Sequence, residues 1–224
     1  MLLASLIMPF MAFLLFNYRG DTDVDPIQFY KWSAFGYTLF IILPVILGIF
    51  CTMLIHEEKQ SDLLKQLWIV PVSKLAYLFS KFFVVLLYSV VFMLITAAAS
   101  ILFSVLPGYV EFEWGSILYL LERCIEIGVL TAFAMLPVLA ITASRKGYVL
   151  PVCVTLVYAF FGFIFMSINM YLIPLTSSAV IVMRNKDIPG IIFAQDINLP
   201  LAFLCICVWD IVSVLLAKIA LKEK

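Results

Sequence analysis

The chain has 224 residues, of which 65% are hydrophobic and 12% are charged, and its mean hydropathy is +1.16. Soluble domains average about 45–50% apolar and about 25% charged residues, so a soluble globule of this size could not bury so much apolar surface. Disordered chains combine low hydrophobicity with high charge, and the same figures exclude them. The net charge is zero, so only the distribution of charge along the chain is informative. The composition predicts a polytopic membrane protein.

Six apolar segments predict an all-α membrane protein with six transmembrane helices, each of which needs about 20 mostly apolar residues. The first segment is the shortest and has neither a basic leader nor a clean small-residue cleavage site. We therefore expect a span that begins abruptly rather than a signal peptide. All 224 residues are assigned to a single transmembrane domain. The predicted spans are residues 1–16, 33–55, 82–106, 117–143, 148–173 and 200–221.

The loops differ in their basic residues. If the spans alternate in direction, nine Lys and Arg residues lie on the side shared by segment 56–81, residues 144–147 and the C-terminal tail. Four lie in the loops on the other side, with Arg123 just inside a span, and seven acidic residues share that second side. Lys and Arg concentrate in cytoplasmic loops. The basic side is therefore predicted to be cytoplasmic, with both termini there.

Two segments on the opposite side depart from plain loops. Residues 17–32 carry Asp21, Asp23 and Asp25, but they lack the glycine and the closing glutamate of a calcium-binding EF-hand loop, so a solvated turn is expected. Residues 174–199 are too apolar for a free loop and too interrupted by polar residues to span. A re-entrant or surface-lying pair of short helices is the economical prediction for them.

Prolines and cysteines indicate packing rather than chemistry. Pro44, Pro137 and Pro151 lie in or near spans, where proline kinks a helix, and we interpret them as packing kinks rather than gating hinges. The five cysteines all lie in apolar runs without a C-x-x-C pair, and His56 is the single histidine. This pattern argues against a disulfide framework and against a metal site.

Segment 56–81 is the most informative part of the chain. Acidic residues open it and basic residues follow, which is the order that a helix dipole favours. Leu63, Leu64, Leu67 and Trp68 form an apolar stripe, and Pro71 ends the helical pattern. The pattern predicts a helix of about three turns across the cytoplasmic surface. Such a helix can rest on the membrane interface or dock in a groove of a soluble partner.

The order of residues in this segment resembles the conserved segment of ABC-2 type permeases. That segment reads approximately E-x-x-x-G-T-x-x-x-L-x-x-x-P-[VL]-S-[RK], with a lysine opening the next helix, and this chain differs from it by having Gln60-Ser61 at the Gly-Thr pair. The resemblance implies a coupling helix that docks in a cleft of a separate nucleotide-binding subunit. The residues that it assigns to ATPase coupling are Glu57, Glu58, Lys59, Asp62, Leu63, Leu64, Leu67, Pro71, Ser73, Lys74 and Lys81.

The resemblance also carries expectations about partners and cargo. The short chain and its aromatic-rich spans look like the peptide-antibiotic immunity branch, which comprises lantibiotic self-protection and bacitracin-type export permeases. It implies a bacterial plasma membrane, two ATPase subunits, a second identical or homologous permease subunit, and an amphipathic peptide as cargo, with no nucleic acid. The chain contains no G-x-x-x-x-G-K-[ST] motif, so ATP and Mg²⁺ are expected on the partner ATPase and no cofactor or catalysis is expected here.

Ionisable groups inside a membrane are costly. Apart from Lys218, which lies near the end of the sixth predicted span and is counted with the C-terminal tail, four charged residues lie inside predicted spans. Glu122, Arg123 and Glu126 share the outer part of the fourth span at i,i+3 and i,i+4 spacing, and Asp210 lies near the middle of the sixth. The first three either line a substrate path or subunit interface, or form an internally paired anchor at the outer interface. Asp210 has no partner within one turn, so it should be neutral or paired with another helix.

Two rival functions remain open. One is an ABC-2 permease for another cargo, such as a drug, sodium or a lipid-linked glycan. The other belongs to a different class: an intramembrane enzyme or secondary transporter that uses Glu122, Glu126 and Asp210. Association with a soluble ATPase separates these classes.

Overall fold

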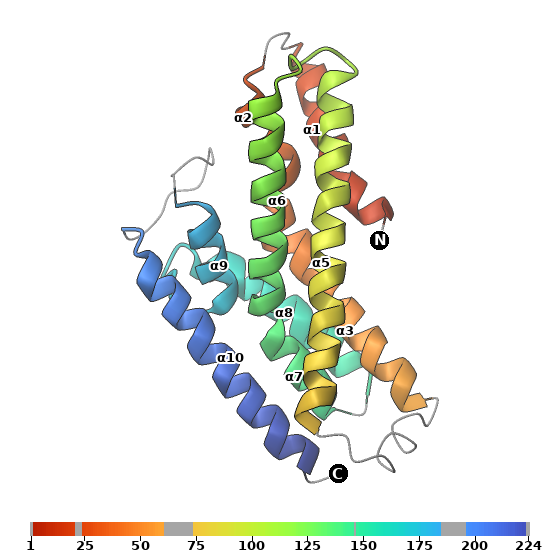
Figure 1. Cartoon of the computed structure of the whole chain (residues 1–224), viewed down its shortest axis with the longest axis vertical. Coiled ribbons are helices and arrows are strands. Elements are labelled where there is room, and N and C mark those ends of the chain that lie inside the picture. The colour runs from red at the N-terminus through yellow and green to blue at the C-terminus, as the bar shows by residue number, and fades with distance from the viewer. Residues whose placement is uncertain (1, 21–23, 61–73, 146, 185–195, 223–224) are drawn as a thin grey trace.

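A computed structural model describes residues 2–20, 24–60, 74–145, 147–184 and 196–222, and the regular elements in these ranges are all helical (Figure 1). Five helical segments are long and apolar enough to cross a membrane, which confirms the prediction of an all-α membrane protein. The fifth of the six predicted spans is a shorter apolar helix. The five long segments are Leu2–Arg19, Pro26–Glu58, Leu75–Val105, Trp114–Ser144 and Leu199–Ile219.

The second long segment is continuous but alternates between α-helical and π-helical parts. It begins where the Asp25 carboxylate accepts a hydrogen bond of 3.0 Å from the Ile27 amide and Pro26 occupies the first turn, an arrangement that favours a helix start. Two π-helical stretches precede Pro44, which has no amide proton to donate to the preceding turn. The parts of this segment are α2 (Pro26–Tyr30), η1 (Lys31–Phe35), η2 (Thr38–Ile42) and α3 (Leu43–Gln60).

The helices on either side of the predicted coupling segment extend beyond the bounds predicted for the spans. Residues 56–60 continue α3 instead of starting a separate helix, and α5 (Lys74–Val105) begins eight residues before the predicted third span. Hydropathy locates the edge of the hydrocarbon, whereas Glu, Lys and Gln are good helix formers that extend the hydrogen-bond ladder beyond that edge. Residues 61–73, which contain most of the predicted coupling helix, lie outside the described ranges.

Helices α5 and α6 (Trp114–Ala134) lie side by side, and they are in extensive contact (Figure 1). Their backbones approach closely at Gly128, where an added Cβ would lie 3.1 Å from the Val90 Cα. The Ser89 hydroxyl donates a hydrogen bond of 2.7 Å to the Gly128 carbonyl at the same crossing. Small residues allow this kind of close helix contact in membranes. Helix α1 (Leu2–Arg19) packs on the other side of α5.

The fourth predicted span is divided at Met135 into α6 and α7 (Leu136–Ser144). Pro137 cannot donate a hydrogen bond to the preceding turn, which explains the break and confirms the predicted kink. The Tyr158 hydroxyl donates a hydrogen bond of 2.8 Å to the Ala134 carbonyl next to the break. A carbonyl at the kink is thereby satisfied from another helix, as the interior of a membrane protein requires.

The fifth span is shorter than predicted, because α8 (Val149–Phe165) ends before residue 173. Turns follow it, in which the Asn169 side chain accepts a hydrogen bond of 3.0 Å from the Tyr171 amide, a local bond that competes with helix. Helix α9 (Pro174–Val182) then begins on a proline, and all nine of its residues are buried. The first nine residues of segment 174–199 thus form a short helix inside the protein rather than on its surface. Helix α10 (Leu199–Lys222) agrees with the predicted sixth span.

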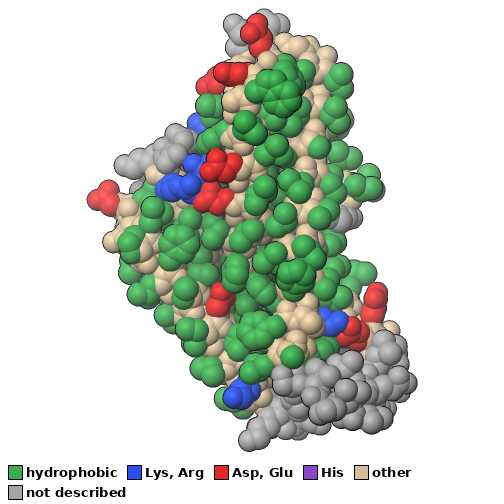
Figure 2. Space-filling view, viewed as in Figure 1, with side chains coloured by type: hydrophobic (Ala, Val, Ile, Leu, Met, Phe, Trp, Pro, Cys, Tyr) green, Lys and Arg blue, Asp and Glu red, His purple; other side chains and the backbone are tan. Residues whose placement is uncertain are grey.

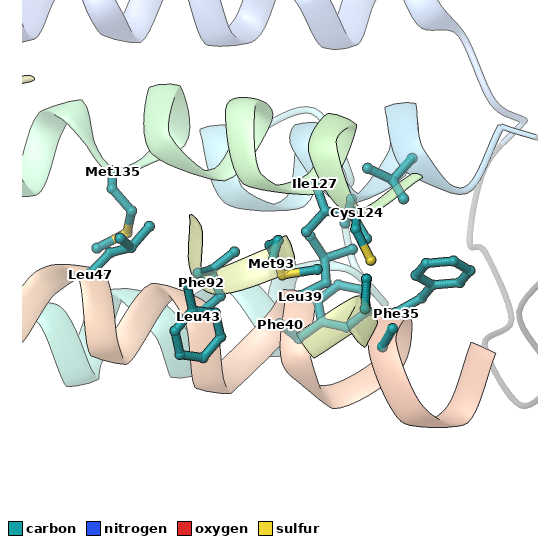
Figure 3. Close-up of a cluster of buried hydrophobic side chains, with 14 of the residues drawn as sticks. Phe35, Leu39, Phe40, Leu43, Leu47, Phe92, Met93, Cys124, Ile127 and Met135 are labelled. Carbon is teal, nitrogen blue, oxygen red and sulfur yellow. The ribbon is translucent and has the colours of Figure 1, made fainter. Parts of the chain in front are cut away.

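The core lies where the second, third and fourth segments meet (Figure 3). Most of the remaining surface is apolar, and Figure 2 shows the charged side chains gathered at a few places on it. At one end of the molecule, here called the proximal end, α3 ends, α5 starts, α7 ends and the C-terminus lies (Figure 1). Buried core side chains include Phe35, Leu39, Phe40, Leu43 and Leu47 with Phe92, Met93, Cys124, Ile127 and Met135.

The opposite, distal end is tied together by contacts between two connections. The Val24 amide donates a hydrogen bond of 3.1 Å to the Tyr109 carbonyl. The Tyr109 hydroxyl donates one of 3.0 Å to the Asn17 side chain. The connection from α1 to α2 is therefore fixed to the connection from α5 to α6. Of the predicted solvated turn, Asp25 caps α2, and residues 21–23 lie outside the described ranges.

Candidate functional site

The first polar cluster joins the two helices that flank residues 61–73, and we call it the Glu58 clamp after its members Glu58, Tyr77 and Lys81. The Lys81 ammonium forms an ion pair with Oε1 of Glu58. The Tyr77 hydroxyl donates a hydrogen bond of 2.9 Å to Oε2 of the same carboxylate. Lys81 also lies over the Tyr77 ring, with its Nζ 5.4 Å from the centroid. Both carboxylate oxygens are therefore occupied by groups from α5.

Helix geometry explains the clamp. Tyr77 and Lys81 are four residues apart on α5, so they project from the same face. Glu58 lies near the C-terminus of α3, where the helix dipole disfavours an anion, and the Lys81 cation offsets that cost. The Lys81 and Glu58 side chains are 14% and 26% exposed, so the pair is largely shielded from water and is screened less than a surface pair.

The structure places the predicted coupling residues only in part. Glu57 is exposed in the last turn of α3, the backbone of Lys59 continues that helix, and Lys74 is the first residue of α5. Asp62, Leu63, Leu64, Leu67, Pro71 and Ser73 lie outside the described ranges. Tyr77 is the member of the clamp that sequence reasoning missed, because an aromatic residue in an apolar run gives no indication of a polar contact.

The second polar cluster, here called the distal cluster because it lies farther from the proximal end than the Glu58 clamp, is centred on the middle of α6. Its Arg123 is buried, and its Glu126 and Arg184 are partly exposed. The Arg123 guanidinium donates a hydrogen bond of 2.7 Å to Oε2 of Glu126, and Arg184 forms an ion pair with Oε1. Arg184 also donates a hydrogen bond of 3.1 Å to the Ile181 carbonyl at the end of α9. One carboxylate thus joins α6 to Arg184, in the turn that follows α9. Glu122, the third predicted member of the patch, is exposed, and the hydrogen bonds of this cluster do not involve it.

The Arg123 side chain is 7% exposed, so its charge needs compensation. Glu126 supplies an anion at i+3, and the Tyr119 ring at i−4 lies under the guanidinium, 5.3 Å from its carbon to the ring centroid. Arg184 is 58 residues from Glu126 in sequence. No local spacing could have indicated that contact, because it depends on how α9 packs against α6.

Asp210 lies at the middle of α10. Its Oδ1 is buried and has no hydrogen-bond partner among the residues that the structure describes. A buried polar atom of this kind costs about 1–3 kcal/mol, so a second subunit or a cargo group would gain by contacting it. The neighbouring Trp209 is fixed by a hydrogen bond of 3.0 Å from its indole nitrogen to the Leu172 carbonyl.

The fold and these clusters define a polytopic helical membrane protein with a buried arginine in its fourth long segment and an ion pair that joins the two helices on either side of residues 61–73. A family model described as "ABC-2 family transporter protein" matches residues 1–162. The chain therefore belongs to the ABC-2 transporter family and is a membrane-spanning permease subunit. Such permeases are typically the non-catalytic membrane subunit, and the family implies an ATPase partner. Comparison with curated proteins found no similar relative.

Proposed function

We propose that this chain is the permease subunit of an ATP-driven exporter that expels amphipathic antimicrobial peptides, of lantibiotic or bacitracin type, for self-protection or resistance. Segment 56–81 would be the docking site of the ATPase. Two permease subunits, identical or homologous, would form the pathway, with two ATPase subunits that bind ATP and Mg²⁺ at the proximal end. The proximal end would face the cytoplasm, with both termini on that side.

The Glu58 clamp is the observation that carries the docking proposal. A segment can transmit motion to the spans only if its ends are attached to them. The clamp links the end of α3 to the start of α5 through both oxygens of one carboxylate. A displacement of segment 61–73 by the ATPase would therefore move two spans together. This supports a coupling role for the segment over a passive position on the membrane interface.

The cargo proposal is supported by an apolar groove beside α1. The groove has a volume of about 440 Å³ and is bordered by the exposed side chains of Met11, Leu14 and Tyr18. Three aromatic residues with polar atoms, Tyr18, Trp32 and Tyr37, lie among its aliphatic walls. Such side chains suit a ligand with both apolar and polar parts. The lining residues are Met8, Met11, Ala12, Leu14, Leu15, Tyr18, Trp32 and Tyr37.

The rival use of the intramembrane acids as proton-transfer or catalytic groups receives less support. Glu126 already accepts from two guanidinium groups, which occupy both of its carboxylate oxygens. Glu122 is exposed rather than directed into the bundle. Asp210 alone among the three combines a buried oxygen with an open hydrogen-bonding capacity. A role in the pathway or at the subunit interface is the proposal for Asp210.

Co-purification with the ATPase tests the docking proposal. The ATPase encoded beside the permease gene is expressed with the wild-type chain, with Glu58→Lys, with Leu64→Asp and with the distal control Glu113→Lys. We expect the ATPase to bind the wild type and the control and to be lost from the two proximal variants. If no ATPase associates with the wild type, or if all four chains retain it equally, the docking proposal is wrong.

A resistance assay tests the cargo separately. A sensitive bacterium that carries the permease and its ATPase is exposed to a lantibiotic, to bacitracin and to a small cationic drug. We expect a higher inhibitory concentration for a peptide and no change for the drug. The protection against the peptide should disappear in a strain whose ATPase cannot hydrolyse ATP. A complex that binds its ATPase but protects only against the drug would overturn the cargo and leave the docking proposal standing.

A further inference from the structure

A second groove lies between α7 and α10 near the proximal end, with a volume of about 370 Å³. Its walls are mostly aliphatic, and large hydrophobic residues of α10 around it are exposed. The groove therefore opens onto the surface of the bundle that meets lipid. The lining residues are Pro137, Ala140, Ile141, Ser144 and Arg145 on the α7 side and Trp209, Val212, Ser213, Leu216, Ala217 and Ile219 on α10.

The polar groups of this groove are concentrated at one end. Ser144 is the last residue of α7 and Arg145 follows it, so both lie at the proximal mouth. Arg145 is the charged residue among the described lining side chains. Lys218 is an exposed residue of α10 between two lining residues, Ala217 and Ile219. The mouth is basic, and the interior is apolar.

We propose that this groove binds one anionic phospholipid, with an acyl chain along α10 and the headgroup phosphate at Arg145. The length of the groove along α10, from Trp209 to Ile219, is about 15 Å at 1.5 Å per residue, which matches half of a hydrocarbon core of about 30 Å. Basic pockets between transmembrane helices are sites for anionic lipid headgroups. An apolar wall alone would accept any acyl chain, and the arginine at the mouth gives the selectivity for negative charge.

The groove beside α1 provides an internal comparison. It is of similar volume and more apolar, and no Lys or Arg is among its described lining residues. Each groove contains one tryptophan, Trp32 in the first and Trp209 in the second. Trp209 is held against the groove wall by its hydrogen bond to the Leu172 carbonyl, so it reports on whatever occupies the groove.

The experiment uses single-tryptophan forms of the full chain, in which the other three of the four tryptophans are replaced by phenylalanine. Each form is reconstituted in phosphatidylcholine vesicles that contain either brominated phosphatidylglycerol or brominated phosphatidylcholine in both leaflets. Bromine quenches tryptophan fluorescence on contact. We expect the anionic lipid to quench Trp209 at roughly fivefold lower mole fraction than the zwitterionic lipid, and Trp32 to show no such preference.

Substitutions at the mouth identify the group responsible. Arg145→Gln should abolish the preference at Trp209, and Arg145→Lys should retain most of it because the charge remains. Lys31→Gln, at the distal end, is the control that should change nothing. Equal quenching by the two lipids at Trp209 would overturn the proposal, and so would an equal preference at Trp32 or a preference that survives Arg145→Gln.

If the proximal end is cytoplasmic, as the proposed function requires, the bound lipid belongs to the cytoplasmic leaflet, and this leaflet assignment therefore rests on the proposed function. The existence of the binding site does not rest on it. Both leaflets of the vesicles contain the brominated lipid, so the quenching is independent of orientation. A negative result in the ATPase experiment would overturn the docking proposal and leave the lipid result unchanged.

Discussion

Lys81 and Glu58 form an ion pair between residues 23 positions apart, and that pair closes the polypeptide between two spans into a loop. Here the last turn of α3 and the third turn of α5 are joined directly, with Tyr77 adding a second hydrogen bond to the same carboxylate. The loop between them therefore has a fixed base.

The ion pair predicts the result of a charge exchange. Glu58→Lys places two cations together in a largely shielded position and should lower the free energy of unfolding by about 2 kcal/mol. The double variant Glu58→Lys with Lys81→Glu restores opposite charges, with the cation now at the C-terminus of α3, where the dipole favours it. We expect it to recover most of the thermal stability and of the ATPase binding lost in the single variant. If the double variant recovers neither the thermal stability nor the ATPase binding, the ion pair does not explain the effect of Glu58→Lys.

Glu126 should be the most sensitive residue of the distal cluster. Glu126→Gln leaves Arg123 and Arg184 without their shared anion, and Arg123 is almost fully buried. We expect the free energy of unfolding in detergent to fall by about 2 kcal/mol, as measured by thermal or denaturant unfolding. The matched control Glu122→Gln removes an exposed carboxylate one turn away and should change stability by less than about 0.5 kcal/mol. Equal losses in the two variants would contradict the network.

Substitution of Asp210 should reduce function without reducing stability. Its buried Oδ1 has no hydrogen-bond partner within the described part of the chain, so removal of the carboxylate costs the isolated subunit nothing. We expect Asp210→Ala to keep or slightly raise thermal stability but to reduce export or assembly more than Lys222→Ala does. Export assays and chemical cross-linking of the assembled complex measure the two effects. Equal export and equal assembly in both variants would show that Asp210 has no role beyond its own helix.

Gly48 should tolerate no side chain. A Cβ added there would overlap the buried side chain of Thr155, which holds α8 against α3 and bonds to the Pro151 carbonyl at 2.9 Å. Gly48→Ala should therefore destabilise the protein by about 1–3 kcal/mol through overpacking. Gly147→Ala is the control, because nothing lies within 4 Å of a Cβ at that position. Thermal unfolding of the two variants in the same detergent measures the difference.

Hydropathy predicted the membrane class and indicated where the five long apolar helices lie, because a bilayer imposes a simple length and composition rule. The ends of the helices could not be predicted in the same way. The second span starts at Pro26, where Asp25 supplies a cap, and the third starts at Lys74, where polar residues continue the helix beyond the apolar run. Hydrogen bonding rather than hydrophobicity decides these boundaries.

In the candidate site, too, some contacts could be predicted from the sequence and others could not. The contact between Arg123 and Glu126 follows from their i,i+3 spacing on one helix, so it could be predicted from the sequence. The contacts of Arg184 with Glu126 and of Tyr77 with Glu58 join residues on different elements, so they depend on packing that no periodicity encodes. Whether any of these residues takes part in transport stays a prediction.

Helix α5 contains 32 residues without a break, which makes it about 48 Å long, against a hydrocarbon core of about 30 Å. Its neighbour α6 reaches the proximal end only through the break at Met135 and a second helix, α7. The two therefore differ in stiffness, because α5 is one uninterrupted helix whereas α6 and α7 are separated by a break. If the ATPase displaces the Glu58 clamp, as we propose, α5 would transmit that displacement as a single rigid rod from the proximal to the distal end.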